Sequence, residues 1–129
     1  MTLGNICSLF YNLKDDNLKR QIASNYRCSL KVFSNYIETI RVIRNTCAHG
    51  ACVYNLSLAK GIKSTPSVPI SEAKRHNISG VIDVIRHMIG CISVNRLEQM
   101  NEEIISLLRK DRSEKTADII TNCTGFAVK

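Results

Sequence analysis

Apolar residues recur every three or four positions along most of this 129-residue chain, which is the period of an amphipathic α-helix. No segment shows the strict apolar–polar alternation of a half-buried β-strand, and the sequence contains no internal repeat. Aromatic residues make up 5% of the chain and tryptophan is missing, which suits a helical bundle better than a β-sandwich. The sequence therefore predicts an all-α fold of about five to six helices, with residues 1–129 as a single domain.

Capping residues set the expected helix boundaries. Asp15 and Asp16 stand where a second helix would begin, and Ser29 is a good N-cap for a third. Gly50 supplies the left-handed residue that often ends a helix. The expected helices cover residues 3–13, 15–26, 30–49, a start at Ser71 or Asn77 running to Ser93, 95–110 and 116–122.

The same periodicity assigns an inward-facing side to the five longer helices. The residues expected there are Leu3, Ile6, Cys7, Phe10 and Leu13 of the first, Leu18, Ile22 and Tyr26 of the second, Phe33, Tyr36, Ile37, Ile40, Ile43 and Cys47 of the third, Ile78, Val81, Ile82, Ile85, Met88, Ile89 and Ile92 of the fourth, and Leu97, Met100, Ile104, Leu107 and Leu108 of the fifth.

The helical period fails between Ala51 and Pro69. Gly61, Pro66 and Pro69 mark this stretch as a loop of about 20 residues, a length that is uncommon in a compact domain and often functional. We therefore expect one long loop, residues 51–69, between the third and fourth helices.

The chain is basic, with a formal net charge of +7. Such a charge favours an acidic partner, of which nucleic acid is the commonest, although a basic surface that only contacts water is an equally ordinary reading. The six cysteines are expected to be reduced thiols of a cytoplasmic protein, because no basic region followed by an apolar run and a cleavage site directs export. The most apolar stretch, residues 81–94, is interrupted by charges and too short to cross a membrane.

The segment Arg44-Asn45-Thr46-Cys47-Ala48-His49 carries the chemistry that stands out in the sequence. It holds a permanent cation, a side-chain amide and the side chain that titrates near neutral pH. With RNA, Arg44 would bind phosphate oxygens, Asn45 would orient a neighbouring group and His49 would move a proton while the 2′-hydroxyl attacks phosphorus. Spacing alone is a weak signal, since Arg44 and His49 lie about 140° apart around a helix, and a solvated cation with a capping histidine is the commoner reading.

The residues around this segment resemble the signature of the Abi-like (abortive infection) family, which belongs to the HEPN superfamily of helical nucleases. The resemblance rests on Arg44-Asn45-x-Cys47-Ala48-His49 followed by Asn55, and it extends to Leu3-Gly4, residues 19–26, residues 34–44 and Gly125-Phe126. It covers nearly the whole chain but only the C-terminal half of a typical member. Residues 1–129 are thus either a naturally short member or the C-terminal part of a longer family domain.

The resemblance implies a HEPN-like helical bundle that cleaves RNA without metal or cofactor, as a toxin or phage-defence enzyme in the bacterial cytoplasm. Arg44, Asn45 and His49 match the family's catalytic residues, and two copies of this motif would face each other across a homodimer. A protein or RNA antitoxin is a further implied partner. Where the family often has a second histidine and two arginines, this chain has Gly50, Cys52 and Leu56. These departures favour the alternative, a non-catalytic RNA-binding and dimerisation module.

Other residues extend the candidate RNA surface. They are Lys19, Arg20, Arg41, Asn55, Lys74 and Arg75, with solvated cations as the ordinary alternative. A zinc site drawn from Cys47, His49, Cys52, His87 and Cys91 has suitable ligand types, but nothing in the spacing brings the two groups together. The preferred interpretation is that these cysteines are buried thiols that bind no metal, so the sequence predicts no metal site.

Overall fold

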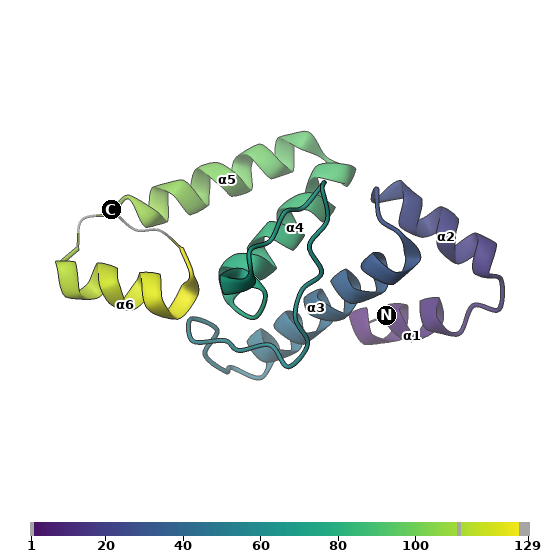
Figure 1. Cartoon of the computed structure of the whole chain (residues 1–129), viewed down its shortest axis with the longest axis horizontal. Coiled ribbons are helices and arrows are strands. Elements are labelled where there is room, and N and C mark those ends of the chain that lie inside the picture. Colours follow the sequence, from purple (N-terminus) through teal and green to yellow (C-terminus); the bar gives the residue numbers. More distant parts are fainter. Residues whose placement is uncertain (1, 111, 127–129) are drawn as a thin grey trace.

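A computed structural model describes residues 2–110 and 112–126, and over these ranges the chain is all-α, as the sequence predicts. The elements are α1 (Leu3–Tyr11), α2 (Asp16–Asn25), α3 (Leu30–Ala48), a short 3₁₀ turn η1 (Glu72–Lys74), α4 (Ile78–Ile92), α5 (Val94–Leu108) and α6 (Glu114–Thr124). Helices α3 and α4 form the centre of the molecule, with α1 and α2 at one end and α5 and α6 toward the other (Figure 1).

Polar N-cap side chains begin each of these α-helices. Ser29 accepts a hydrogen bond from the backbone N–H of Val32, which confirms the expected start of α3. Asn77 does the same for α4, so of the two expected starts Asn77 is right and Ser71 opens η1 instead. Ser93 has an extended backbone that both ends α4 and caps α5, which places the start of α5 one residue before the expected Asn95.

The core forms around α3. Tyr36 is fully buried, and its ring lies between α3, the long loop and α4, where its hydroxyl donates to the carbonyl oxygen of Lys63 at 2.9 Å. The buried residues that pack together are Phe10, Ala23, Phe33, Tyr36, Ile43, Leu58, Ile62, Val68, Ile70, Val81, Val84 and Met88. Four of them come from the stretch between α3 and η1.

The long loop is confirmed as non-helical, but it is not a free surface segment. Leu58, Ile62, Val68 and Ile70 are buried in the core, and the guanidinium of Arg75 donates from Nε to the carbonyl oxygen of Ile62 at 3.0 Å. In Figure 1 the loop passes across α3 and α4 before it turns back into η1. This segment therefore supplies part of the hydrophobic core that the helices alone leave open.

Several residues expected to face inward are exposed. None of the residues of α5 is buried, and Leu107 is 56% exposed, although α5 packs along α4. Ile92, the last residue of α4, is 72% exposed. Ile6, Leu18 and Cys47 are also exposed, and Leu13 lies beyond the end of α1. The last helix is longer than expected, since it begins after Ser113 and ends at Thr124.

Within the part of the chain that the structure describes, no helix combines the length and the apolar character that crossing a bilayer requires.

Candidate functional site

The segment from Arg44 to His49 occupies the last turn of α3 and its C-cap. Gly50 adopts a left-handed conformation with φ of 70°, as expected for the residue that ends this helix. Its N–H donates to the carbonyl oxygen of Cys47, and the N–H of Ala51 donates to that of Thr46, both at 3.1 Å. This pair of bonds is the Schellman motif, which fixes the helix end and therefore the backbone that carries His49.

Asn45 links the arginine of the motif to the side of the helix that carries the histidine. Asn45 and His49 are four residues apart, so they lie on the same face of α3, whereas Arg44 starts about 140° away from His49. The Arg44 guanidinium turns toward this face, because its Nη1 donates to the Asn45 Oδ1 at 3.2 Å. The Asn45 side chain is half-buried and the Arg44 side chain is exposed. Asn45 is therefore placed to orient Arg44, which is the role expected for it.

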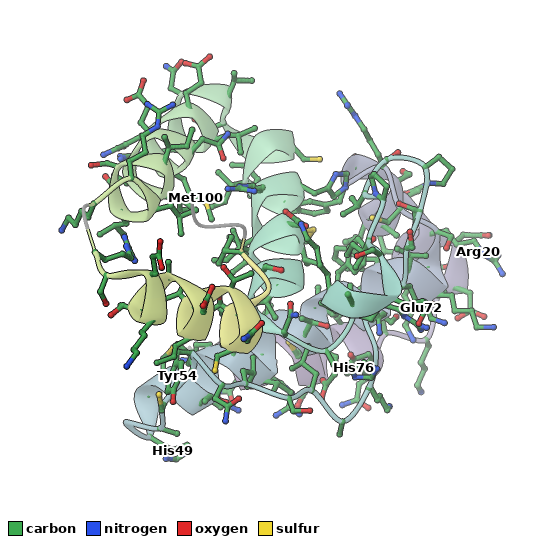
Figure 2. All side chains as sticks on the ribbon, turned by 60° about the vertical axis from the view of Figure 1, so that its left-hand side comes forward. Arg20, His49, Tyr54, Glu72, His76 and Met100 are labelled. Atoms are coloured by element: carbon green, nitrogen blue, oxygen red, sulfur yellow. The ribbon has the colours of Figure 1, made fainter. Side chains whose placement is uncertain are left out.

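His49 is exposed and lies at the edge of the molecule, pointing into solvent (Figure 2). Its backbone N–H donates to the carbonyl oxygen of Asn45 at 3.0 Å, and its imidazole forms no hydrogen bond with the described residues. Figure 2 shows Tyr54 at the same end of the molecule. The adjacent Asn55 is exposed in the turn that the N–H of Leu56 closes on the carbonyl oxygen of Val53.

Five of the six other candidate RNA-binding residues have structural partners. The weakest of these contacts is that of Arg20, which donates from Nη1 to Asn17 Oδ1 on the same helix at 3.5 Å. Lys19 donates from Nζ to the carbonyl oxygen of Tyr11 at 3.0 Å and so ties α2 to the end of α1. Lys74 forms an ion pair with Asp83 at 3.7 Å. The Arg75 guanidinium donates to the carbonyl oxygen of Ile62 and to the carboxylate of Glu72. Arg41 pairs with Glu38 one turn away on α3.

Arg20 and the sixth candidate, Asn55, do not lie together. Arg20 projects from the opposite side of the molecule from His49 (Figure 2), whereas Asn55 lies in the turn a few residues after it. The structure therefore places Arg41 and Asn55 on α3 and the turn that follows it, and it does not gather the other four candidates around the motif.

The Glu38–Arg41 pair keeps a carboxylate charged on α3. The Arg41 guanidinium donates from Nε to Glu38 Oε2 at 2.9 Å, and this hydrogen bond lowers the pKa of Glu38 despite partial burial, with Lys60 adding a weaker effect in the same direction. The positive charge of Arg41 is thus largely balanced by the carboxylate of Glu38.

The residues weighed above as zinc ligands do not form a cluster. Cys47 and Cys52 are exposed free thiols, whereas His87 Nε2 lies 3.7 Å from Cys28 Sγ and 4.0 Å from Cys91 Sγ. The same nitrogen is 2.6 Å from the carbonyl oxygen of Tyr26, a distance that assigns it a proton and leaves it no free lone pair for a metal. Among residues 2–110 and 112–126, no three histidine, cysteine or acidic side chains are close enough together to hold a metal ion.

The structure also shows a groove that sequence reasoning missed. It has a volume of about 860 Å³ and lies between α3 and residues 58–63 of the long loop, with Lys31, Lys60 and Lys63 among its lining residues. The one available signal was the four-three spacing of Lys31, Asn35 and Glu38 along α3. The two loop lysines could not be placed, because loop residues carry no periodicity.

Comparison with known proteins identifies one family. Residues 1–55 match the model of the Abi-like protein family, and this range contains Arg44, Asn45, His49 and Asn55. No curated protein and no solved structure matches the chain. The family match supports the Abi-like resemblance of the motif and of the three helices that lead to it.

Proposed function

We propose that this chain, which is Abi-like over residues 1–55, is an endoribonuclease of abortive infection or toxin type that needs no metal. The family suggests a role in abortive infection, and the catalytic activity and the HEPN assignment are our proposal. The observation that carries it is the Arg44–Asn45 hydrogen bond, which turns a phosphate-binding group toward the face of α3 that ends in an exposed histidine. The protein would act in the bacterial cytoplasm and be restrained by a protein or RNA antitoxin.

The proposed reaction is transesterification within the RNA strand. The 2′-oxygen attacks the adjacent phosphorus, the bond from phosphorus to the 5′-oxygen breaks, and the products carry a 2′,3′-cyclic phosphate and a 5′-hydroxyl. Arg44 would bind the non-bridging phosphate oxygens and stabilise their added negative charge, while His49 would accept or donate the proton that moves. Asn45 would hold Arg44 in place through the contact described above.

Cleavage of RNA by the wild-type protein in EDTA is the test of this proposal. We expect fragments that end in a 2′,3′-cyclic phosphate, because the motif supplies a phosphate-binding group and a proton-transfer group without any metal. Mixed single-stranded RNA, incubated with the purified protein and resolved by gel electrophoresis and end-group analysis, provides the measurement. Intact RNA after incubation with the well-folded protein, or ends with a free 3′-hydroxyl, would contradict the proposed chemistry.

A homodimer is the second expectation. One subunit offers a single imidazole at the motif, whereas transesterification benefits from both an acid and a base, and a twofold axis near the end of α3 would bring in a second His49. Sedimentation equilibrium at micromolar concentration is therefore expected to give twice the 14.5 kDa mass of the chain. A monomer under conditions in which RNA is cleaved would exclude the composite site.

The alternative is an RNA-binding and dimerisation module that has lost turnover. It is favoured by Leu56, which stands where the family often has an arginine and instead packs partly buried against the core, and by Cys52 at a second such position. A gel shift of intact RNA by wild-type protein, without any cleavage, would select this alternative.

A further inference from the structure

The groove beside α3 is a concave site that is separate from the Arg44–His49 motif. Its lining residues are Tyr11, Lys31, Ser34, Asn35, Glu38, Thr39, Val42, Leu58, Ala59, Lys60, Gly61 and Lys63. One wall is thus a face of α3, the other is a segment of the long loop, and Tyr11 of α1 also lines the groove. A volume of about 860 Å³ is within the range of ligand-binding pockets.

Hydrogen bonds from α3 hold the loop wall in place. The side-chain amide of Asn35 donates to the carbonyl oxygen of Gly61 at 3.2 Å and accepts from the backbone N–H of Lys63 at 2.9 Å. The buried hydroxyl of Tyr36 donates to the carbonyl oxygen of Lys63 at 2.9 Å. Because these three bonds fix the backbone, Lys60 and Lys63 are presented from a rigid segment and binding would cost little ordering of the chain.

The groove is positively charged. Lys31, Lys60 and Lys63 line it, and none of the three forms an ion pair with a residue that the structure describes. Glu38 is the one acidic residue among the lining residues, and its charge is balanced by the bidentate pair with Arg41. Three lysine ammonium groups therefore remain to attract an anion, most simply the phosphates of a polyanion.

Tyr11 adds an aromatic surface to the lysines. Its side chain lines the groove and is 42% exposed, while its hydroxyl donates to the carbonyl oxygen of Ser34 at 3.4 Å. An exposed aromatic ring beside a cationic groove is the combination by which proteins hold single-stranded nucleic acid, since the ring stacks on a base and the cations follow the backbone. A base can stack on the ring only when it is free of a duplex partner.

The face of α3 that forms the groove continues to the motif. Lys31, Glu38, Val42, Asn45 and His49 follow one another at intervals of three, four or seven residues and so lie on one stripe of the helix. From Val42, a lining residue of the groove, to His49 the helix axis rises about 10 Å. A strand that occupies the groove can therefore extend along the stripe to the end of α3.

We propose that this groove binds single-stranded RNA, with Lys31, Lys60 and Lys63 on the phosphates and Tyr11 stacked on a base. The strand then runs along α3 toward His49, and this last step rests on the ribonuclease function proposed above. The groove would thus hold the RNA on one side of the cleavage point.

The proposed RNA binding is tested with a fluorescent single-stranded RNA, whose binding is followed by fluorescence anisotropy. All proteins carry His49→Ala, so that the RNA stays intact. The triple variant Lys31→Gln, Lys60→Gln, Lys63→Gln is expected to weaken binding at least about tenfold and to reduce the slope of log K against log salt by about 2, since each lost phosphate contact removes about 0.7. The matched control is Arg96→Gln, Arg109→Gln, Lys115→Gln, which removes the same charge from exposed positions of α5, its C-cap and α6. Equal weakening by the two triple variants would overturn the proposal.

Substitutions of Tyr11 distinguish the contribution of base stacking to RNA binding from that of the lysine charges. Tyr11→Leu is expected to weaken binding about tenfold while Tyr11→Phe binds as wild type, because stacking needs the ring and not the hydroxyl. Single-stranded DNA of the same sequence is expected to compete, since the contacts are to phosphates and a base, whereas duplex RNA is not. Equal competition by the duplex, or wild-type binding by Tyr11→Leu, would contradict the stacking role.

The proposal for the groove and the proposal for the catalytic site can be rejected independently of each other. Lysine-dependent binding of RNA that the wild-type protein leaves intact would support the groove and reject the ribonuclease. Cleavage that depends on His49 but keeps its KM in the Lys31, Lys60, Lys63 triple variant would support the ribonuclease and reject the groove.

Discussion

Replacing His49 by alanine is expected to lower the rate of RNA cleavage by about 100-fold to 10,000-fold, which is the contribution typical of a general acid or base. The reason is that His49 supplies the imidazole at the end of the face of α3 toward which Asn45 turns Arg44. Arg44→Ala is expected to cause a loss of similar size, because a phosphate whose charge rises in the transition state would lose its bidentate partner. Single-turnover cleavage of a defined RNA, at saturating protein, measures both changes.

Neither variant should alter the fold. His49 is exposed, its imidazole makes no hydrogen bond with the described residues, and surface changes of this kind shift the free energy of unfolding by about 0.5 kcal/mol or less. Arg96→Ala is a matched control for Arg44→Ala, since both arginines are exposed and donate from Nη1 to the side-chain oxygen of a residue on the same helix. Unchanged cleavage by His49→Ala, or an equal loss in Arg96→Ala, would rule out the catalytic assignment.

Features that depend on neighbouring residues could be predicted from the sequence. The caps at Ser29 and Asn77 and the left-handed Gly50 involve contacts within a few positions, so the local sequence contains all the information that they need. For the same reason the placement of the motif at the end of α3 could be read directly. Arg27 is an exception, because it adopts φ of 55° at the end of α2, where the sequence offers no glycine.

Features that depend on distant contacts could not be predicted. Periodicity shows that Leu107 and Ile92 share a face with other apolar residues, but how far each residue is covered depends on how the helices pack. Helix α5 packs on α4, yet Leu107 stays 56% exposed and Ile92 stays 72% exposed. The loop residues Ile62 and Val68 show no period, yet they are buried because η1 and α3 hold the loop over the core. The groove depends on long-range bonds of the same kind, so only its α3 wall, with Lys31, Asn35 and Glu38 on one face, could be anticipated from the sequence.

Gly80 shows how closely these distant segments pack, and Gly80→Ala is expected to lower the free energy of unfolding by about 3 kcal/mol. Gly80 is buried in the first turn of α4, and a Cβ atom there would overlap the carbonyl oxygen of Lys74 and lie 3.0 Å from Ile62 Cδ1. The Lys74 carbonyl belongs to the backbone of η1, so it cannot swing aside as a flexible side chain would. Urea unfolding followed by circular dichroism measures the effect as a lower midpoint with an unchanged slope.

Gly4→Ala is the matched control, because Gly4 also lies in the first turn of a helix but a Cβ atom there would have only Thr2 Oγ1 nearby, at 3.8 Å. Alanine is favoured over glycine in helices by up to about 1 kcal/mol, so this variant is expected to be as stable as wild type or slightly more so. The two substitutions are chemically identical, and opposite signs would show that the close contact between α4, η1 and the long loop causes the loss in Gly80→Ala. If Gly80→Ala were instead as stable as Gly4→Ala, η1 would have to pack less closely on α4 than described, and with it the segment that carries Lys60 and Lys63 along the groove.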